Sequence, residues 1–155
     1  MHNNAAGCGI KEENLEAITQ KLNERYKNVS KEHLFYVDYI WGMNEINQEV
    51  ILCIAEKCAT FWGQEIPESK IGVTDIDLSK CQLRLCGSRN NTLRMIAPDG
   101  TVFVKFGIDE EEFERINQPN MFMNCLCSPE RNEWMGSVSG EFIIDEYEAK
   151  KKWVF

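Results

Sequence analysis

The stretch from Lys80 to Phe106 decides the fold. It reads KCQLRLC (80–86), GSRN (87–90), TLRMIA (92–97), PDG (98–100) and TVFVKF (101–106). The first, third and last of these segments are interpreted with period two, the pattern of β-strands, and the alternation is clearest in KCQLRLC. The Gly-, Asn- and Pro-containing segments between them are typical of tight turns. The sequence therefore predicts a meander of three short strands.

The alternation also predicts which side of the meander each residue occupies. Leu93, Met95, Val102, Val104 and Phe106 are expected to point inward. Four other residues are expected to point outward: Arg84, Arg94, Phe103 and Lys105. We predict that these four and Arg89, in the first turn, bind DNA. Cations that contact phosphates, next to a ring on which a base can stack, are typical of single-strand binding surfaces. The same pattern is compatible with a solvated sheet face of incidental charge, or with a face that a helix covers.

Further strands and helices are predicted on both sides of the meander. Apolar residues at helical spacing predict an amphipathic helix over residues 11–27 and a second helix over 46–62, and residues 109–116 form a short acidic helix. The predicted strands outside the meander cover residues 34–40, 71–78, 121–127 and 140–147. This order predicts an α+β fold: a small OB-like antiparallel β-barrel with helical additions and an N-terminal amphipathic helix.

Composition limits the function classes. The 155 residues carry a net charge of −8, which is unusual for a nucleic-acid binder, but Lys80–Lys105 holds five cations against the single carboxylate of Asp99. The seven cysteines lack the Cys-x-x-Cys spacing of a zinc site, so we expect free thiols. With no signal peptide and no membrane span in the sequence, we expect a cytoplasmic protein.

Two short motifs stand at opposite ends of the chain. Residues 1–7 read MHNNAAG, and NEWMG at 132–136 precedes a strand that contains IID at 143–145. The first resembles the Gly-Gly-His stretch that runs into Ala-Ala-Gly in RecJ-type single-strand DNA exonucleases. The second resembles the Asn-x-Trp-x-Gly turn and the Ile-x-Asp strand of their carboxy-terminal OB-fold. Residues 91–106 are similar to the family's paired strands, whereas Ser139-Gly140-Glu141 replaces its usual Gln in the closing strand.

The resemblance implies a division of the chain and a parent enzyme. Residues 1–28 would be the tail of the DHH-associated nucleotide-binding domain, where His2, Asn3 and Gly7 contact a nucleotide, and residues 29–155 would be the OB-fold-like domain. A terminal His2 without such a role is the alternative. The parent would hydrolyse single-stranded DNA with Mn or Mg ions. Because the only histidines are His2 and His33, we expect no catalytic residue, metal site or cofactor in this chain.

The expected function is therefore that of a single-stranded DNA-binding, substrate-guiding module of a RecJ-like 5′–3′ exonuclease, which acts in DNA repair and recombination. Its partners would be single-stranded DNA and the missing catalytic domain, with no membrane. The alternative is a structural or protein-interaction module that contacts a partner through its acidic surface at 109–116. Trp134 is expected to plug one end of the barrel, and Gly136 to permit a tight hairpin turn.

Overall fold

The structure, a computed structural model, describes residues 9–27, 36–63 and 65–152. The chain divides into two compact units, with the boundary in the sequence after residue 35. In the first unit, the described residues form a 3-10 turn at Glu12–Asn14 and helix α1 (Leu15–Arg25). The predicted helix over 11–27 is thus confirmed. The prediction of two domains with separate roles, divided at residue 28, stays a prediction.

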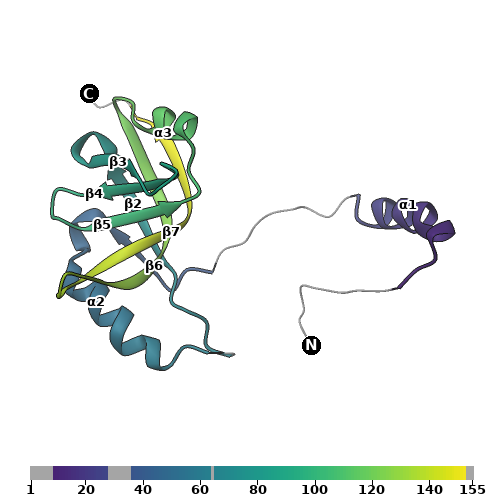
Figure 1. Cartoon of the computed structure of the whole chain (residues 1–155), viewed down its shortest axis with the longest axis horizontal. Coiled ribbons are helices and arrows are strands. Elements are labelled where there is room, and N and C mark those ends of the chain that lie inside the picture. Colours follow the sequence, from purple (N-terminus) through teal and green to yellow (C-terminus); the bar gives the residue numbers. More distant parts are fainter. Residues whose placement is uncertain (1–8, 28–35, 64, 153–155) are drawn as a thin grey trace. The chain divides into compact units, whose positions relative to one another are not determined.

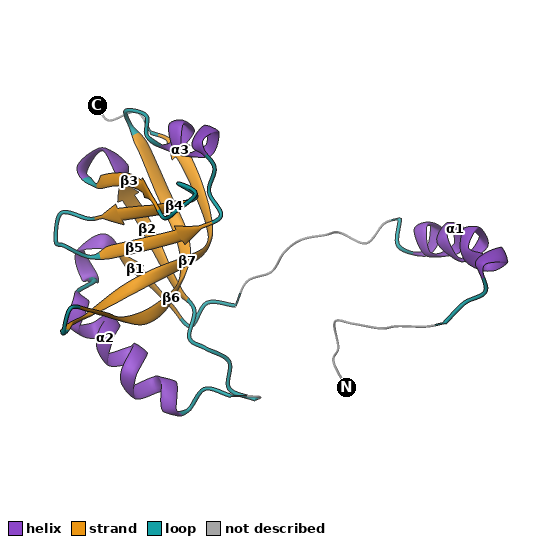
Figure 2. Ribbon diagram, in the orientation of Figure 1, coloured by secondary structure: helices purple, strands orange, loops and turns teal. Residues whose placement is uncertain are grey.

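The second unit is built on one mixed sheet of seven strands (Figures 1 and 2). The strands are β1 (Tyr39–Gly42), β2 (Ile71–Asp77), β3 (Gln82–Cys86), β4 (Thr92–Ile96), β5 (Val102–Phe106), β6 (Met121–Trp134) and β7 (Ser137–Lys151). Their order across the sheet is β1-β2-β6-β7-β5-β4-β3. The pairs β1–β2 and β5–β7 are parallel, and the other neighbours are antiparallel.

The sheet is open among the described residues, with β1 and β3 at its two edges. The α+β class is confirmed, but the small OB-like barrel that the sequence predicted is not. The long β6–β7 hairpin carries the sheet, and its strands pair from Met121 with Lys151 to Trp134 with Ser137. The sequence predicted these two strands only over residues 121–127 and 140–147, which is shorter than observed. The parts that it missed are mostly polar and lack the alternating pattern.

Two helices pack at different places on the sheet (Figure 2). Helix α2 (Gln48–Lys57) begins at Asn47, whose side chain accepts a hydrogen bond from the Val50 backbone N at 2.8 Å. Helix α3 (Glu110–Ile116) begins at Asp109, which accepts from the Glu112 N at 2.7 Å. The remaining 3-10 turns are Met43–Glu45, Cys58–Thr60 and Leu78–Lys80. No helix among the described residues is long and apolar enough to cross a membrane.

The core lies between α2 and one face of the sheet, which we call the inner face. It includes Leu93, Met95, Phe103 and Phe142, all fully buried, and the rings of Phe103 and Phe142 lie 5.4 Å apart between centroids. Ile51 of α2 is also fully buried and reaches this layer. The buried apolar area of such side chains is what stabilises the unit.

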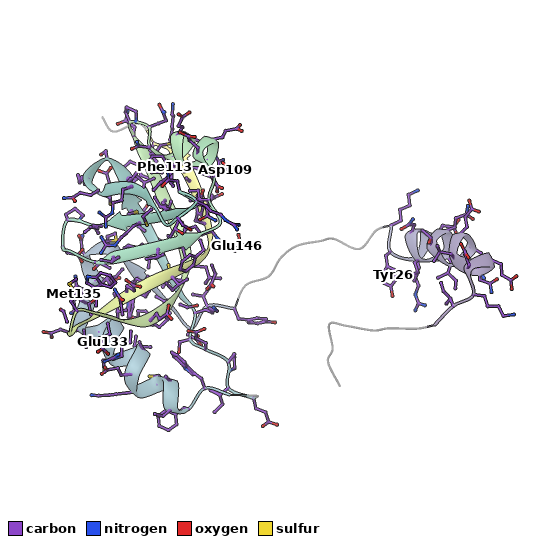
Figure 3. All side chains as sticks on the ribbon, viewed as in Figure 1. Tyr26, Asp109, Phe113, Glu133, Met135 and Glu146 are labelled. Atoms are coloured by element: carbon purple, nitrogen blue, oxygen red, sulfur yellow. The ribbon has the colours of Figure 1, made fainter. Side chains whose placement is uncertain are left out.

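Trp134 does not plug an end of the sheet, as the sequence analysis expected. It lies beside the turn of the β6–β7 hairpin and is 69% exposed. The two turn residues, Met135 and Gly136, have φ values of 50° and 80°, as in a type I′ turn. The tight turn at Gly136 is therefore confirmed. Figure 3 shows Met135 and Glu133 at one end of the sheet, far from Asp109 and Phe113 at the other.

Candidate nucleic-acid interface

Two predicted DNA-binding residues meet on the face of the sheet opposite the core. Arg84 of β3 and Arg94 of β4 are direct cross-strand partners, so their side chains point to the same side. Arg84 is exposed and Arg94 half-buried. Among the described residues, no carboxylate lies within 4.0 Å of either guanidinium. We call this side the outer face, and it carries two adjacent cations without close counter-ions.

The strand register extends this pair into a row across the sheet. Arg94 is opposite Val104 of β5, Val104 is opposite Ile143 of β7, and Ile143 is opposite Ser128 of β6. Partners in register point to the same side of a sheet. The outer face therefore carries a row that begins with two arginines, continues through the buried Val104 and the half-buried Ile143, and ends at the buried Ser128 hydroxyl.

A second polar cluster lies at the far end of this row. The Nζ of Lys70 donates to the Ser128 hydroxyl and, at 2.7 Å, to the Asp145 carboxylate, which also accepts from Ser128 Oγ at 2.9 Å. Sequence reasoning missed this cluster because Lys70 is 58 and 75 residues from its partners. Pairing over such separations has no local signal in a single sequence.

Phe103 is not on the outer face, which corrects the prediction of an exposed aromatic there. It is opposite Met95, has no exposed surface, and packs on Phe142 in the core. Phe106, expected inside, is instead 61% exposed. The segment VFVKF is apolar on both sides of the strand, so alternation alone did not fix its orientation. A shift of one residue moves every side chain to the other face.

Because β5 has the opposite orientation to the one predicted, Lys105 also lies away from the outer face. Lys105 is opposite the buried Leu93, and its Nζ donates to the backbone oxygen of Asp145 at 2.5 Å. Its ammonium is thus half-buried and engaged within the fold. Phe106 is opposite Thr92, one position along the outer face from the Arg94–Val104 pair. The exposed ring near the arginines is therefore Phe106.

Two carboxylates lie beside the cation row. Glu141 of β7 is the cross-strand partner of Glu130 of β6, and its other neighbour in register is Val102 of β5. Burial raises the pKa of Glu141, and the negative charge of Glu130 adds to this, while Arg94 and a hydrogen bond from Asn132 act in the opposite direction. The outer face is therefore of mixed charge, with its cations toward β3.

The remaining predicted residues lie elsewhere. Arg89 is exposed in the turn between β3 and β4. His2, Asn3 and Gly7 lie outside the described residues. In the part of the chain that the structure describes, no three His, Cys, Asp or Glu side chains come close enough to hold a metal ion.

The acidic segment predicted as a protein contact is α3, and its packing is defined. The Tyr147 hydroxyl donates to the Glu112 carboxylate, and Arg115 lies 3.9 Å from the same group. The hydrogen bond from Tyr147 joins the helix to β7, whereas the Arg115–Glu112 pair lies within α3. The exposed acids of its first turn, Glu110 and Glu111, face solvent.

Comparison with solved structures finds a protein with a similar fold. RecJ from Thermus thermophilus, solved in complex with Mn²⁺, matches 93% of this chain with a TM-score of 0.67. The match covers 20% of the RecJ chain at 10% sequence identity, so it shows a shared fold. No family model matches the sequence. The second unit thus has the architecture of part of a RecJ protein.

Two sequence relatives match the chain over most of its length. A protein named as an SPbeta prophage-derived single-strand DNA-specific exonuclease, YorK, of Bacillus subtilis strain 168 is 27% identical over 151 residues. The counterpart in Bacillus phage SPbeta matches equally well. The match covers 96% of this chain and 26% of each relative, so the chain spans about a quarter of their length. The chain is homologous to part of a RecJ-like single-strand DNA exonuclease, which confirms the resemblance found in the sequence.

Proposed function

We propose that the chain is the single-stranded DNA-binding, substrate-guiding module of a RecJ-like exonuclease and is not catalytic by itself. The observation that carries the proposal is the cross-strand pair of Arg84 and Arg94, which have no close counter-ion among the described residues. The homology to proteins named as single-strand DNA-specific exonucleases supports DNA as the partner.

The pair has the properties of a phosphate contact. Cross-strand side chains begin about 5 Å apart, so two guanidinium groups offer a concentrated positive charge and several donors to a backbone. Arginine remains charged under all working conditions, and phosphate contacts of this kind carry no sequence information. The exposed ring of Phe106 adds a surface on which a base can stack, worth ~1–3 kcal/mol.

A titration of the full chain with a fluorescent oligothymidylate, without metal ions, tests the proposal. We expect binding at low salt that weakens toward physiological salt, because neutralised phosphates release counter-ions. Arg84→Ala with Arg94→Ala should weaken binding and lower the salt slope by about 1.4, which corresponds to two phosphate contacts on a single strand.

The matched control is Arg25→Ala with Arg115→Ala. Both of these arginines are exposed and lie on α1 and α3, and the pair changes the net charge by the same amount. If the two double variants bind equally well, the outer face is not the DNA contact. A wild-type chain that binds no oligothymidylate at low salt would contradict the proposal and favour a protein-interaction module that uses acidic α3.

A further inference from the structure

A cavity of about 430 Å³ opens where strands β3, β4 and β5 end. It begins directly beyond the last register pair of β4 and β5, Thr92 with Phe106. Its lining includes two apolar side chains and four polar ones: Leu85, Ile108, Arg89, Asn90, Asn91 and Glu110. Leu85 is opposite the buried Leu93, so the cavity lies at the strand ends on the inner-face side, and Gly107 of its lining directly follows Phe106 in the chain.

Backbone contacts fix the walls of this cavity. The Asn91 carbonyl oxygen accepts hydrogen bonds from the backbone N of Gly107 at 2.9 Å and of Ile108 at 3.2 Å. This joins the β3–β4 turn to the segment that leads into α3. Within the turn, Asn90 donates its backbone N to the Gly87 carbonyl at 3.2 Å, and Asn90 has a φ of 49°. The two asparagines are thus held by their backbones, and both residues line the cavity.

The polar side chains of the lining are not engaged with each other. Arg89 and Glu110 form no ion pair within the described residues, and both are exposed. No hydrogen bond joins the side-chain amide of Asn90 or of Asn91 to another described residue. In contrast, the neighbouring Asp109 carboxylate accepts from the Glu112 N at 2.7 Å and is used within the fold. A cation, two amides and one carboxylate therefore remain for a ligand.

We infer that this cavity binds one unpaired nucleotide and prefers a base with an exocyclic amino group to thymine. Its aliphatic walls, Leu85 and Ile108, suit the faces of a base, and the Arg89 guanidinium suits the attached phosphate. The Glu110 carboxylate accepts hydrogen bonds only, and an amino group such as N4 of cytosine donates them. Thymine has the carbonyl oxygen O4 at that position, which cannot donate, so a carboxylate placed against the C4 substituent favours cytosine.

This inference rests on the proposed function, because the nucleotide would come from the strand that contacts Arg84 and Arg94. Phe106 lies between that pair and the cavity, and its ring is 61% exposed. A strand that leaves the outer face would pass this ring and turn around the ends of β4 and β5 to reach the cavity on the inner-face side. The arginine pair would then supply affinity without selectivity, and the cavity would supply a base preference.

The test compares oligodeoxycytidylate with oligothymidylate of equal length on the full chain, at slightly alkaline pH and fixed salt. Both are pyrimidine strands, and their bases differ in the C4 substituent, in the proton on N3 of thymine and in the thymine methyl group, so the Glu110 variant below isolates the contact with the amino group. We expect oligodeoxycytidylate to bind about tenfold more tightly, in the range that one good base contact provides. Glu110→Ala should remove most of this difference, by weakening the cytosine complex and leaving the thymine complex equal or tighter.

Glu111→Ala is the matched control, since Glu111 is the next acid on α3, is exposed and is not part of the cavity lining. Asn91→Ala, which keeps the backbone contacts, is the second variant and should also reduce the preference. Equal binding of the two strands, with affinity that still depends on Arg84 and Arg94, would overturn the base pocket and leave the proposed function intact. Binding of neither strand would overturn both.

Discussion

Arg84 and Arg94 lie directly opposite each other on neighbouring antiparallel strands, with the same sign of charge and no carboxylate within 4.0 Å among the described residues. Like charges in this arrangement destabilise a sheet, by the same ~0.2–1 kcal/mol that favourable cross-strand pairs contribute. A phosphate between the two guanidiniums would remove the repulsion. The pair is therefore a place where stability and binding are expected to oppose each other.

Arg84→Thr should separate these two effects. Thr is well suited to a strand, and its side chain removes the repulsion, so we expect the free energy of unfolding to rise by about 0.5 kcal/mol. The affinity for oligothymidylate should fall severalfold at low salt. Urea unfolding and a DNA titration of the same preparation measure both quantities. A variant that is less stable and binds DNA normally would show that Arg84 is a structural residue.

The proposed DNA binding should depend on pH through Glu141. Burial and Glu130 raise its pKa above the ordinary value of 4.5, so this carboxylate takes up a proton at a higher pH than an exposed one. The protonated form adds no negative charge near Arg94. We therefore expect affinity for DNA to increase as the pH falls through the raised pKa of Glu141. Glu141→Gln should bind DNA more tightly at neutral pH and lose the change in affinity that protonation of Glu141 causes. The control is Glu49→Gln, which replaces an exposed acid on α2 and should change neither quantity.

The raised pKa of Glu141 also makes the stability of the fold depend on pH. Because the folded-state pKa of Glu141 is above its unfolded value, the folded chain binds this proton more tightly than the unfolded chain. The resulting stabilisation is fully present below pH 4.5 and is lost as the pH rises through the raised value. Glu141→Gln should therefore be more stable than wild type at neutral pH. Equal melting temperatures at neutral pH would contradict the assignment of burial as the cause.

The sequence predicted most elements of the fold and about half of the candidate interface. Strong periodicity and turn residues located α2, the β3–β5 meander and the hairpin turn at Gly136, because these features depend on neighbours in the chain. The order of strands across the sheet does not depend on neighbours in the chain. The parallel pair of β5 and β7, for example, joins residues 39 positions apart, such as Val102 and Glu141. The same pattern of strands and turns along the sequence is therefore compatible with an open sheet and with a barrel.

The errors in the interface have a common physical origin. Arg84 and Arg94 were located correctly because their strands have a clear polar side. The strand Val102–Phe106 has apolar residues on both sides, so its orientation depends on the β4–β5 turn. Ala97 and Thr101 flank this turn, are both buried, and are joined by the Ala97 N–Thr101 O hydrogen bond of 2.9 Å. Thr101 on the inner face places Phe103 there too, and leaves Phe106 outside.

Alanine substitutions at these two phenylalanines should therefore differ in effect: Phe103→Ala should reduce stability, and Phe106→Ala should reduce the affinity for DNA. Phe103→Ala removes a fully buried ring from its contact with Phe142 and should cost about 3–5 kcal/mol of the free energy of unfolding. Phe106→Ala should change stability by less than about 0.5 kcal/mol, as for surface residues. It should weaken DNA binding by roughly the value of one stacked base, ~1–3 kcal/mol. Normal DNA affinity of Phe106→Ala would exclude stacking on this ring.

Gly140 fixes the place where α2 crosses the β6–β7 hairpin. A Cβ at this position would lie 2.5 Å from the Leu52 backbone N and 2.7 Å from the Gln48 carbonyl oxygen, both in α2. Backbone atoms of a helix cannot move aside singly, so Gly140→Ala must shift the whole helix. We expect a loss of about 2 kcal/mol or more of the free energy of unfolding, at the upper end of overpacking effects.

The control for this prediction is Gly63→Ala, because a Cβ at Gly63 meets no atom within 4 Å and should leave stability almost unchanged. The arginine pair belongs to β3 and β4, away from the crossing of α2 over Gly140. Folded Gly140→Ala, measured below its melting temperature, should therefore retain its affinity for DNA. Loss of affinity in the folded variant would show that α2 also takes part in binding.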